Sequence, residues 1–557
     1  MTQLTKGPLR LGVSFFFSAM SIALISGGGP YQKVSTLAAR VPQTAPIETG
    51  KLVTLKGTPD ELHQQIGALE SWASDIGARV RVVSEAVGVV EVFGASQDEV
   101  VAILPSATVE ENVYFPHLLN GSRRQLEAFA DDAAEGMKCT TRDPTLAIQL
   151  GLSKGGPDTF DRGVATLGSS FSLMVREKNA APVTFFWIAS GPTESRYHHV
   201  EQTGTEFEVT TDIPGSYDVL IVAARGDGRC LGRVFRFGVT TSEEFAGTHA
   251  ARHFDASDRS KFVHLGVIEA EAAWAVTRGK GVTVAVIDTG VNFNHPDLTQ
   301  NVAVDANGAL IGSNFCLPTA RPFDDHGHGT HVAGLSASAV MGIAPEATII
   351  PIKALNSMGG GDLSSLVAAI RFAGQIGADV INASFGGESD EFTSIRESIE
   401  YATSRGSLFV VAAGNGDEQG NGFSIDVRPV YPAALGLPGQ LTVAATRFDG
   451  ALSVYSNFGD KNVDVAAPGG DPAAGQGPLM SAYYLPGRKL YVGQMGTSMA
   501  TPVTAGVAAL VKSLHPQESL VQLKARLIAA GHDVPALAGK VRSGKLLNAR
   551  LAVSQRD

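Results

Sequence analysis

The C-terminal half of the chain alternates short apolar runs with segments of helical periodicity. Four runs have the length and composition of buried parallel strands: VTVAVIDTG, ATIIPIKAL, DVINASFGG and LFVVAAGNG. Helical segments such as LSSLVAAIRFAGQIG stand between them. This order predicts a doubly wound α/β domain with a mostly parallel sheet over residues 263–557. Such sheets carry their chemistry at the carboxyl ends of the strands, where each of these runs ends in a polar or glycine-rich cluster.

Residues 50–115 follow a different pattern, in which two helices alternate with four apolar strands. The first helix begins after Thr58, which forms a capping box with Glu61, and a second capping box joins Ser96 to Glu99. The order β-α-β-β-α-β predicts a small α+β unit with the shape of an open-faced sandwich.

Residues 161–242 show a third pattern, with short alternating strands separated by turn signals such as Pro214–Gly215. This spacing predicts an immunoglobulin-like β-sandwich module. The stretch from Pro116 to Asp161 is polar and weakly patterned. Two roles for the module stay open, a spacer that adds stability and a surface that binds substrate or another surface.

The N-terminus has the layout of a secretory signal peptide, which we assign to residues 1–28. Lys6 and Arg10 precede the apolar stretch from Leu11 to Ile25, and small residues follow. The stretch is shorter than the roughly 20 residues that a membrane span needs. We therefore expect export from the cell, with an uncleaved membrane anchor or a buried N-terminal helix as the alternatives.

Composition narrows the choice of partners and compartment. The net charge of -11 argues against a nucleic-acid partner, because phosphates call for a basic face. Cys139, Cys230 and Cys316 are too few for a disulfide scaffold but allow one bridge in an oxidising compartment. The sequence does not fix which two would pair. A length of 557 residues agrees with several domains.

Polar residues with catalytic potential follow two of the predicted strands and begin a helix. Asp288 ends the first run, and DDHGHGTHVAG brings His328 and His331 close together. A zinc-protease helix would carry His-Glu-x-x-His, and this glutamate is absent, so we predict no metal site there. Ser498 lies in GTSMATP at the start of an Ala/Val-rich helix, where it is either a helix cap or a nucleophile. A nucleophilic serine needs a base and a group that orients the base.

Three motifs together resemble those of the subtilisin-like serine proteases, the subtilases. They are VAVIDTGV, HGTHVAG and GTSMATP, in the family's order of Asp, His and Ser. The resemblance covers about residues 263–553 and implies a serine endopeptidase. The resemblance implies that Ser498 attacks the scissile carbonyl, that His328 transfers the proton and that Asp288 orients the imidazole. Asn415 would stabilise the oxyanion, and His331 would be a packed structural residue.

The resemblance also implies a substrate groove and a pocket for the residue before the cleaved bond. Glycine-rich segments would pair with the substrate backbone, and a small-residue wall would leave room for a sizeable apolar or aromatic side chain. The residues concerned are Gly359, Gly360, Gly361 and Leu363; Ser384, Phe385 and Gly386; and Ala412, Ala413 and Gly414.

A common calcium site of the family is expected to be incomplete. Asp297 in NHPDL matches its aspartate, but the segment from Gly334 to Ala347 is too short for the loop that supplies the other ligands. The resemblance implies no cofactor for the chemistry, and calcium elsewhere stays open.

Residues 50–115 resemble the family's inhibitory propeptide, including the exit strand VEENVYF. This implies a secreted, self-processing zymogen that acts on peptides or proteins, with its own propeptide as intramolecular inhibitor, and we expect a monomer. Cleavage between Phe115 and Leu119 would leave the β-sandwich attached, whereas cleavage near Phe262 would release it. The alternatives are a subtilase-shaped peptide ligase or cyclase and a non-catalytic binding protein.

Overall fold

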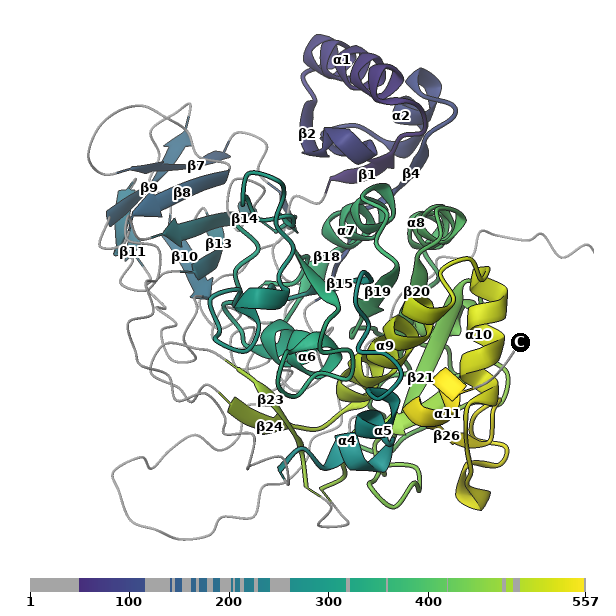
Figure 1. Cartoon of the computed structure of the whole chain (residues 1–557). Helices are drawn as coiled ribbons and strands as arrows, with labels where there is room; N and C mark the ends of the chain where they lie inside the picture. The colour runs from purple at the N-terminus through teal and green to yellow at the C-terminus, as the bar shows by residue number, and fades with distance from the viewer. Residues whose placement is uncertain are drawn as a thin grey trace, which may run out of the picture.

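The computed structural model describes residues 50–115, the strands between 141 and 240, and 261–554 apart from 317–320, 357–358, 418, 473–476 and 484–490. Figure 1 shows an N-terminal α+β unit, a group of β-strands and a larger α/β unit that contains the C-terminus. The predicted signal peptide lies outside the described residues. Within the described helices, none combines the length and apolarity needed to span a bilayer.

A nine-stranded sheet forms the centre of the α/β unit. Its order is β16-β17-β15-β19-β20-β21-β22-β26-β25, and the neighbours are parallel except for β25 and β26. The predicted mostly parallel sheet is therefore confirmed. The strands are β15 (Thr283–Asp288), β16 (Ser313–Asn314), β17 (Thr348–Lys353), β19 (Val380–Ala383), β20 (Leu408–Ala412), β21 (Gln440–Thr446), β22 (Val465–Pro468), β25 (Gly531–Asp533) and β26 (Lys545–Leu547).

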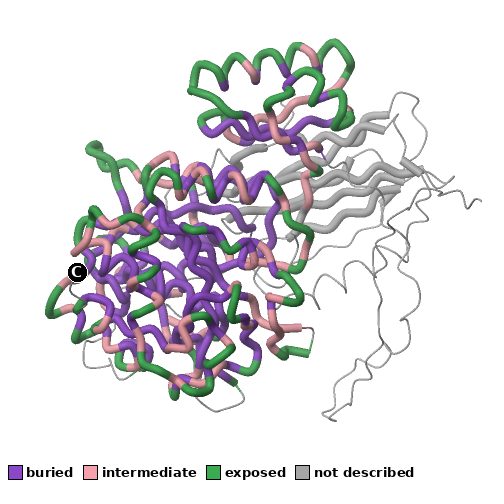
Figure 2. Tube along the Cα trace, turned by 90° about the vertical axis from the view of Figure 1, so that its right-hand side faces the viewer, coloured by how far each residue is buried: buried purple, intermediate pink, exposed green. Residues whose placement is uncertain are grey.

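Helices cover both faces of this sheet. Val284 and Val286 of β15 pack in one apolar cluster with α6 (His328–Ala337) and α9 (Thr497–Leu514). Ala285 and Ile287 point the other way and pack with α7 (Leu363–Gln375) and α8 (Thr393–Ser404). Burial on both sides explains why the strands read as continuous apolar runs, and Figure 2 shows the buried interior that results. The shorter helices are α4 (Val263–Val267), α5 (Ala270–Ala273), α10 (Leu520–Ala529) and α11 (Ala549–Ser554).

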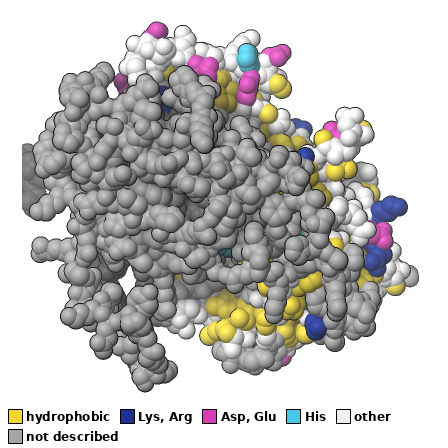
Figure 3. Space-filling model, turned by 90° about the vertical axis from the view of Figure 1, so that its left-hand side faces the viewer, with side chains coloured by type: hydrophobic (Ala, Val, Ile, Leu, Met, Phe, Trp, Pro, Cys, Tyr) yellow, Lys and Arg dark blue, Asp and Glu magenta, His cyan; other side chains and the backbone are white. Residues whose placement is uncertain are grey.

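The N-terminal unit is a four-stranded antiparallel sheet with two helices on one face. The sheet order is β2-β3-β1-β4, and both predicted capping boxes are present. Acidic side chains lie on the outer surface of the unit, at the top of Figure 3. The elements are β1 (Lys51–Thr54), α1 (Pro59–Ile76), β2 (Arg79–Ser84), β3 (Val89–Phe93), α2 (Gln97–Ile103) and β4 (Thr108–Glu111).

The open face of this sheet packs against α7 and α8 (Figure 1). Leu52 and Val89 belong to the same apolar cluster as the residues of α7. Arg371 of α7, only 7% exposed, donates to the carbonyl oxygens of Val87 at 2.9 Å and Leu55 at 3.2 Å. The interface therefore combines apolar burial with hydrogen bonds that satisfy a buried guanidinium.

The chain leaves the N-terminal unit along an edge of the α/β unit. Strand β5 (Tyr114–Phe115) pairs antiparallel with β18 (Gly361–Asp362). The amide of Leu363 also donates to the carbonyl oxygen of Val113 at 2.9 Å. Residues 113–115 therefore occupy the main-chain edge at Gly361–Leu363.

Strands between residues 141 and 240 form two further sheets. One has the order β11-β10-β13-β14-β6 with β8 beside β14, and the other has the order β12-β9-β7. Strand β7 lies against β13 and β14. It precedes residue 161, where we predicted the module to begin. The sequence did not indicate this strand, because its short apolar run stands in a polar stretch. The strands are β6 (Thr141–Arg142), β7 (Leu146–Leu152), β8 (Arg162–Thr166), β9 (Ser170–Glu177), β10 (Thr184–Ser190), β11 (Gln202–Thr203), β12 (Glu206–Thr210), β13 (Gly215–Ala224) and β14 (Arg229–Thr240).

One contact at the interface predicts a local effect on α8. This helix has no side-chain cap of its own, and the Glu110 carboxylate accepts hydrogen bonds from the amides of Thr393 at 2.8 Å and Ser394 at 3.1 Å. Glu110→Ala should weaken the first turn of α8 by roughly 0.5 to 2 kcal/mol and speed its amide hydrogen exchange. The control is Glu111→Ala, because Glu111 contacts Lys51 of its own unit. Equal exchange in the two variants would contradict the capping role.

Candidate active site

Asp288 and His328 meet at the carboxyl end of β15. Asp288 is the last residue of the strand and is fully buried, and His328 is the first residue of α6 and is 6% exposed. Nδ1 of His328 lies 2.8 Å from Oδ1 of Asp288, which also accepts from the amide of Thr289 at 2.7 Å. A buried carboxylate needs such donors. The pairing assigns the proton to Nδ1, so that Nε2 is left as a base.

Asp324 holds the turn that presents His328. Its carboxylate accepts hydrogen bonds from the Thr289 hydroxyl at 2.8 Å, the Gly327 amide at 2.8 Å and the amide of Thr330 at 2.8 Å. The carboxylate thereby replaces the missing side-chain cap of α6 and ties it to the residue after Asp288. Gly327 has φ 96°, and a Cβ there would lie 2.2 Å from the Tyr483 ring, so this turn requires glycine.

Ser498 is the second residue of α9 and is 7% exposed. Its hydroxyl donates to the carbonyl oxygen of Ser384 at 3.0 Å, and the Ser384 hydroxyl donates to the carbonyl oxygen of Ser498 at 2.9 Å. The reciprocal bonds join the start of α9 to the segment after β19. Among the described contacts, no hydrogen bond joins Ser498 to His328. Catalytic hydrogen bonds in proteins without substrate often form only when substrate is bound.

Asn415 follows β20 and lies beside the start of α9. Its Oδ1 accepts from the amide of Thr497 at 2.8 Å and from the Thr497 hydroxyl at 2.7 Å. These two bonds fix which end of the side-chain amide is the acceptor. No described residue accepts a hydrogen bond from the NH2 group of Asn415, which stays available as a donor beside Ser498.

The segments predicted to bind substrate lie around these residues, but their side chains differ in accessibility. Gly361 pairs with Phe115, and the amide of Leu363 donates to Val113. The Leu363 side chain is fully buried and Phe385 is 2% exposed. Gly359 and Gly360 form a turn with Asn356, while Ala412 ends β20 and Ala413 follows it, both buried in the core. Several of the predicted residues can therefore contact a ligand only through their main-chain groups.

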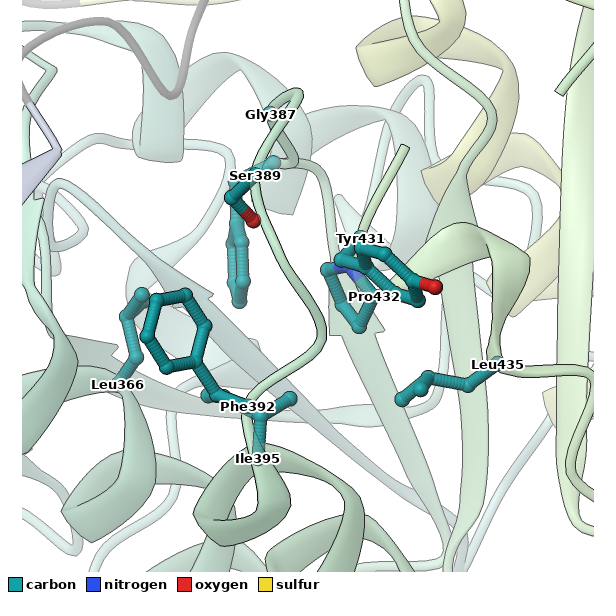
Figure 4. A pocket seen from close by; sticks show the side chains of 9 residues that line it. Leu366, Gly387, Ser389, Phe392, Ile395, Tyr431, Pro432 and Leu435 are labelled. Atoms are coloured by element: carbon teal, nitrogen blue, oxygen red, sulfur yellow. The ribbon is translucent and has the colours of Figure 1, made fainter. Parts of the chain in front are cut away.

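An apolar pocket lies where α7, the start of α8 and two loops meet (Figure 4). Sequence reasoning named only Phe385 of its residues, because the others come from four separate segments that carry no common motif. The lining consists of Leu366, Phe385, Gly387, Ser389, Phe392, Ile395, Tyr431, Pro432 and Leu435. The pocket offers burial for an apolar side chain.

Val430 was missed by the sequence analysis and narrows the space between two predicted walls. Its Cγ1 lies 3.5 Å from the position that a Cβ would take at Gly386, and 3.5 Å from the corresponding position at Gly414. One methyl group therefore fills the gap between these glycines. From the sequence we predicted room here for a sizeable substrate side chain. That prediction took no account of Val430.

Three other residues named from the sequence, His331, Asp297 and Cys316, are buried within the protein. Nε2 of His331 donates to the carbonyl oxygens of Leu479 at 3.0 Å and Val492 at 3.2 Å, and burial lowers the pKa of His331 to about 3. The predicted structural role of His331 is confirmed. The carboxylate of Asp297 accepts from the Tyr491 hydroxyl at 2.6 Å. Cys316 is buried and forms no disulfide with a described residue.

Comparisons with known proteins agree on one family. A model described as the subtilase family matches residues 279–544. Thermitase from Thermoactinomyces vulgaris is 35% identical over 252 residues, covering 44% of this chain and 80% of thermitase. Subtilisin Savinase from Lederbergia lenta is 37% identical over 273 residues, covering 48% and 90%. A solved structure of a cold-adapted subtilisin-like serine proteinase is 30% identical, covers 49% and 90%, and has a TM-score of 0.42. The chain belongs to the subtilase family and is a serine endopeptidase.

Proposed function

We propose that Ser498, His328 and Asp288 form the catalytic triad of a secreted endopeptidase that is made as a self-processing zymogen. The observation that carries this proposal is the hydrogen bond of 2.8 Å between His328 and the fully buried Asp288. It holds the imidazole in the tautomer that leaves Nε2 free to act as a general base. The signal-peptide pattern at residues 1–28 supports export.

In the proposed mechanism, the Ser498 hydroxyl exchanges its bond to the Ser384 carbonyl for one to Nε2 of His328. It then attacks the peptide carbonyl and passes its proton to the imidazole, which gives it to the leaving amine. Water hydrolyses the acyl-enzyme by the same proton transfers in reverse order. Asp288 stays ionised and stabilises the imidazolium. Nucleophile, base and orienting group all come from the chain, so this chemistry requires no cofactor, and a calcium ion would have a structural role only.

Two donors are available for the oxyanion. The first is the NH2 group of Asn415, whose side-chain amide is held through Oδ1 by Thr497, the residue before Ser498. The amide of Ser498 lies in the first turn of α9, where helix amides have no partner within the helix. Both donors are in place before substrate arrives, which is the condition for stabilising developing charge at low cost.

The proposed substrate is a peptide that binds as an added strand along Gly359–Gly361 and Ser384–Gly386. The apolar pocket of Figure 4 would take an apolar side chain several residues before the scissile bond. Between the segments 384–386 and 412–414, Val430 leaves space for a small side chain next to the bond. We therefore replace the expected preference for a large residue at this position by a preference for a small one.

Residues 50–115 would act as the inhibitor and folding template of the enzyme, which works as a monomer. Their strand β5 takes the edge at Gly361–Asp362 that a substrate would need. The buried contacts of Arg371 join them firmly to α7. Processing between Phe115 and Leu119 would free this edge. Residues 116–140, which contain this bond, lie outside the described part of the chain.

Ser498→Ala should abolish peptide hydrolysis and leave an unprocessed precursor, because the proposed maturation uses the enzyme's own nucleophile. Electrophoresis and intact mass of the purified variant, with no other protease present, measure this. Ser404→Ala, an exposed serine on α8, is the control and should mature normally. A fully processed Ser498→Ala protein would exclude Ser498 as the nucleophile.

Asn415→Ala should lower kcat by about 10² to 10³ with little change in KM, because the lost hydrogen bond forms only in the transition state. This range is the effect of removing the oxyanion-hole asparagine of subtilisin, a member of the same family. Steady-state kinetics on a peptide substrate measure it, with Asn421→Ala on an exposed loop as control. A change in KM alone would place Asn415 in a binding pocket instead.

Val430→Ala should raise the ratio of kcat/KM for a peptide with Phe before the scissile bond to kcat/KM for the same peptide with Ala. We expect a rise of roughly tenfold or more, since the variant removes the methyl group between Gly386 and Gly414. The control is Val427→Ala, because Val427 is 85% exposed. An unchanged ratio in Val430→Ala would show that this methyl group does not limit the pocket.

A further inference from the structure

A fully buried ammonium group lies beside the proposed triad. Lys353 is the last residue of β17 and has no exposed surface. Its Nζ lies 2.7 Å from each of three acceptors, namely the carbonyl oxygens of Thr289 and Leu355 and Oδ1 of Asp325. An ammonium group has three protons to donate, so all of its hydrogen-bonding capacity is used.

Two of the three acceptors of Lys353 belong to the segments that carry Asp288 and His328. Thr289 follows Asp288, and Lys353 lies opposite Asp288 in the register of β15 and β17. Asp325 is in the turn that precedes His328 and is 4% exposed. The Lys353 side chain on β17 therefore joins the end of β15 to the turn before α6.

The ion pair between Lys353 and Asp325 lies among other charged groups near His328. His328 contacts the carboxylate of Asp288, and its ring lies 6.3 Å from the ring of His326, on which the carboxylates of Asp288, Asp324 and Asp325 act. Lys353 of β17 interacts with Asp324 and Asp325 and with the thiol of Cys316, which follows β16. Burial opposes the charge of Lys353 most strongly, but Asp325, Cys316 and Asp324 together outweigh this effect and raise the pKa of Lys353. The ion pair of 2.7 Å between Lys353 and Asp325 is neutral as a whole.

Stability alone is a weak reason for such a pair. Replacing a buried ion pair by apolar residues of similar volume is often neutral or stabilising, whereas removing one partner leaves a costly unpaired charge. The ion pair does, however, hold two loops in one relative position, which an apolar contact would do with less directional precision.

We propose that the Lys353–Asp325 ion pair is a positioning element for catalysis. It holds Asp288 and His328 at hydrogen-bonding distance and cancels a charge that would otherwise act on the imidazolium. This inference rests on the roles proposed above for Asp288 and His328. Neither Lys353 nor Asp325 touches the reacting atoms.

The decisive variant is Asp325→Asn, which keeps the size and the Oδ1 acceptor but removes the charge. The unpaired ammonium should disfavour the imidazolium of His328 and lower its pKa. The acid limb of kcat/KM against pH should then move to lower pH by about half a unit or more. Asp533→Asn is the control, because the Asp533 side chain is 89% exposed, and it should leave the limb in place.

The double variant Asp325→Asn/Lys353→Met separates charge from geometry. It restores local neutrality, so the acid limb should return to its wild-type position, while kcat stays reduced roughly tenfold or more because the loops are no longer joined. Circular dichroism confirms folding of each variant. If Asp325→Asn alone does not fold, the double variant still tests the proposal through its kcat.

The proposal is overturned by an acid limb that does not move in folded Asp325→Asn, or by wild-type kcat in the double variant. Failure of the triad assignment itself would look different, since His328→Ala would then retain activity. The two hypotheses are therefore tested by separate measurements.

Discussion

The hydrogen bond between His328 and the buried carboxylate of Asp288 is the interaction on which the rest of the site depends. Asp288 has no exposed surface, so its charge must be compensated by donors within the protein. His328 and the amide of Thr289 supply two such donors. These two bonds to Oδ1 offset part of the desolvation of the carboxylate, and the imidazole gains a fixed orientation. The need of the buried Asp288 carboxylate for hydrogen-bond donors therefore also gives His328 the orientation that the proposed mechanism requires.

Neighbouring residues act to keep that bond in place. Asp324 orders the turn before α6, and Gly327 permits its backbone conformation. The parallel sheet brings the ends of β15 and β20 to the same edge, and α9 begins beside them. Asp288, Asn415 and Ser498 therefore gather at one edge from positions far apart in the chain. This is the usual place for chemistry in a doubly wound sheet.

The sequence predicted those features that depend on local pattern. Continuous apolar runs indicated β15, β17, β19 and β20, and capping boxes marked both helices of the N-terminal unit. The proposed triad residues were found through motifs, because each lies in a distinctive local context.

Residues whose role depends on tertiary packing were not predicted. Val430 lies between Gly386 and Gly414 only after the fold brings three segments together. The sequence around Lys353 is that of an ordinary strand end, and its burial depends on acceptors that include Thr289 and Asp325 of two other segments. Leu366 and Phe392 reach the apolar pocket from two different helix starts. The short strand β7 was also missed, since an isolated apolar run carries little periodic signal.

Covalent labelling tests the central claim most directly, namely that His328, oriented by Asp288, activates Ser498. The mature enzyme is treated with a fluorophosphonate, digested with trypsin and mapped by mass spectrometry, beside His328→Ala and heat-unfolded protein. The account predicts one adduct, on Ser498, in the native enzyme and almost none in the other two samples. An adduct on another residue, or equal labelling of Ser498 in His328→Ala, would contradict it.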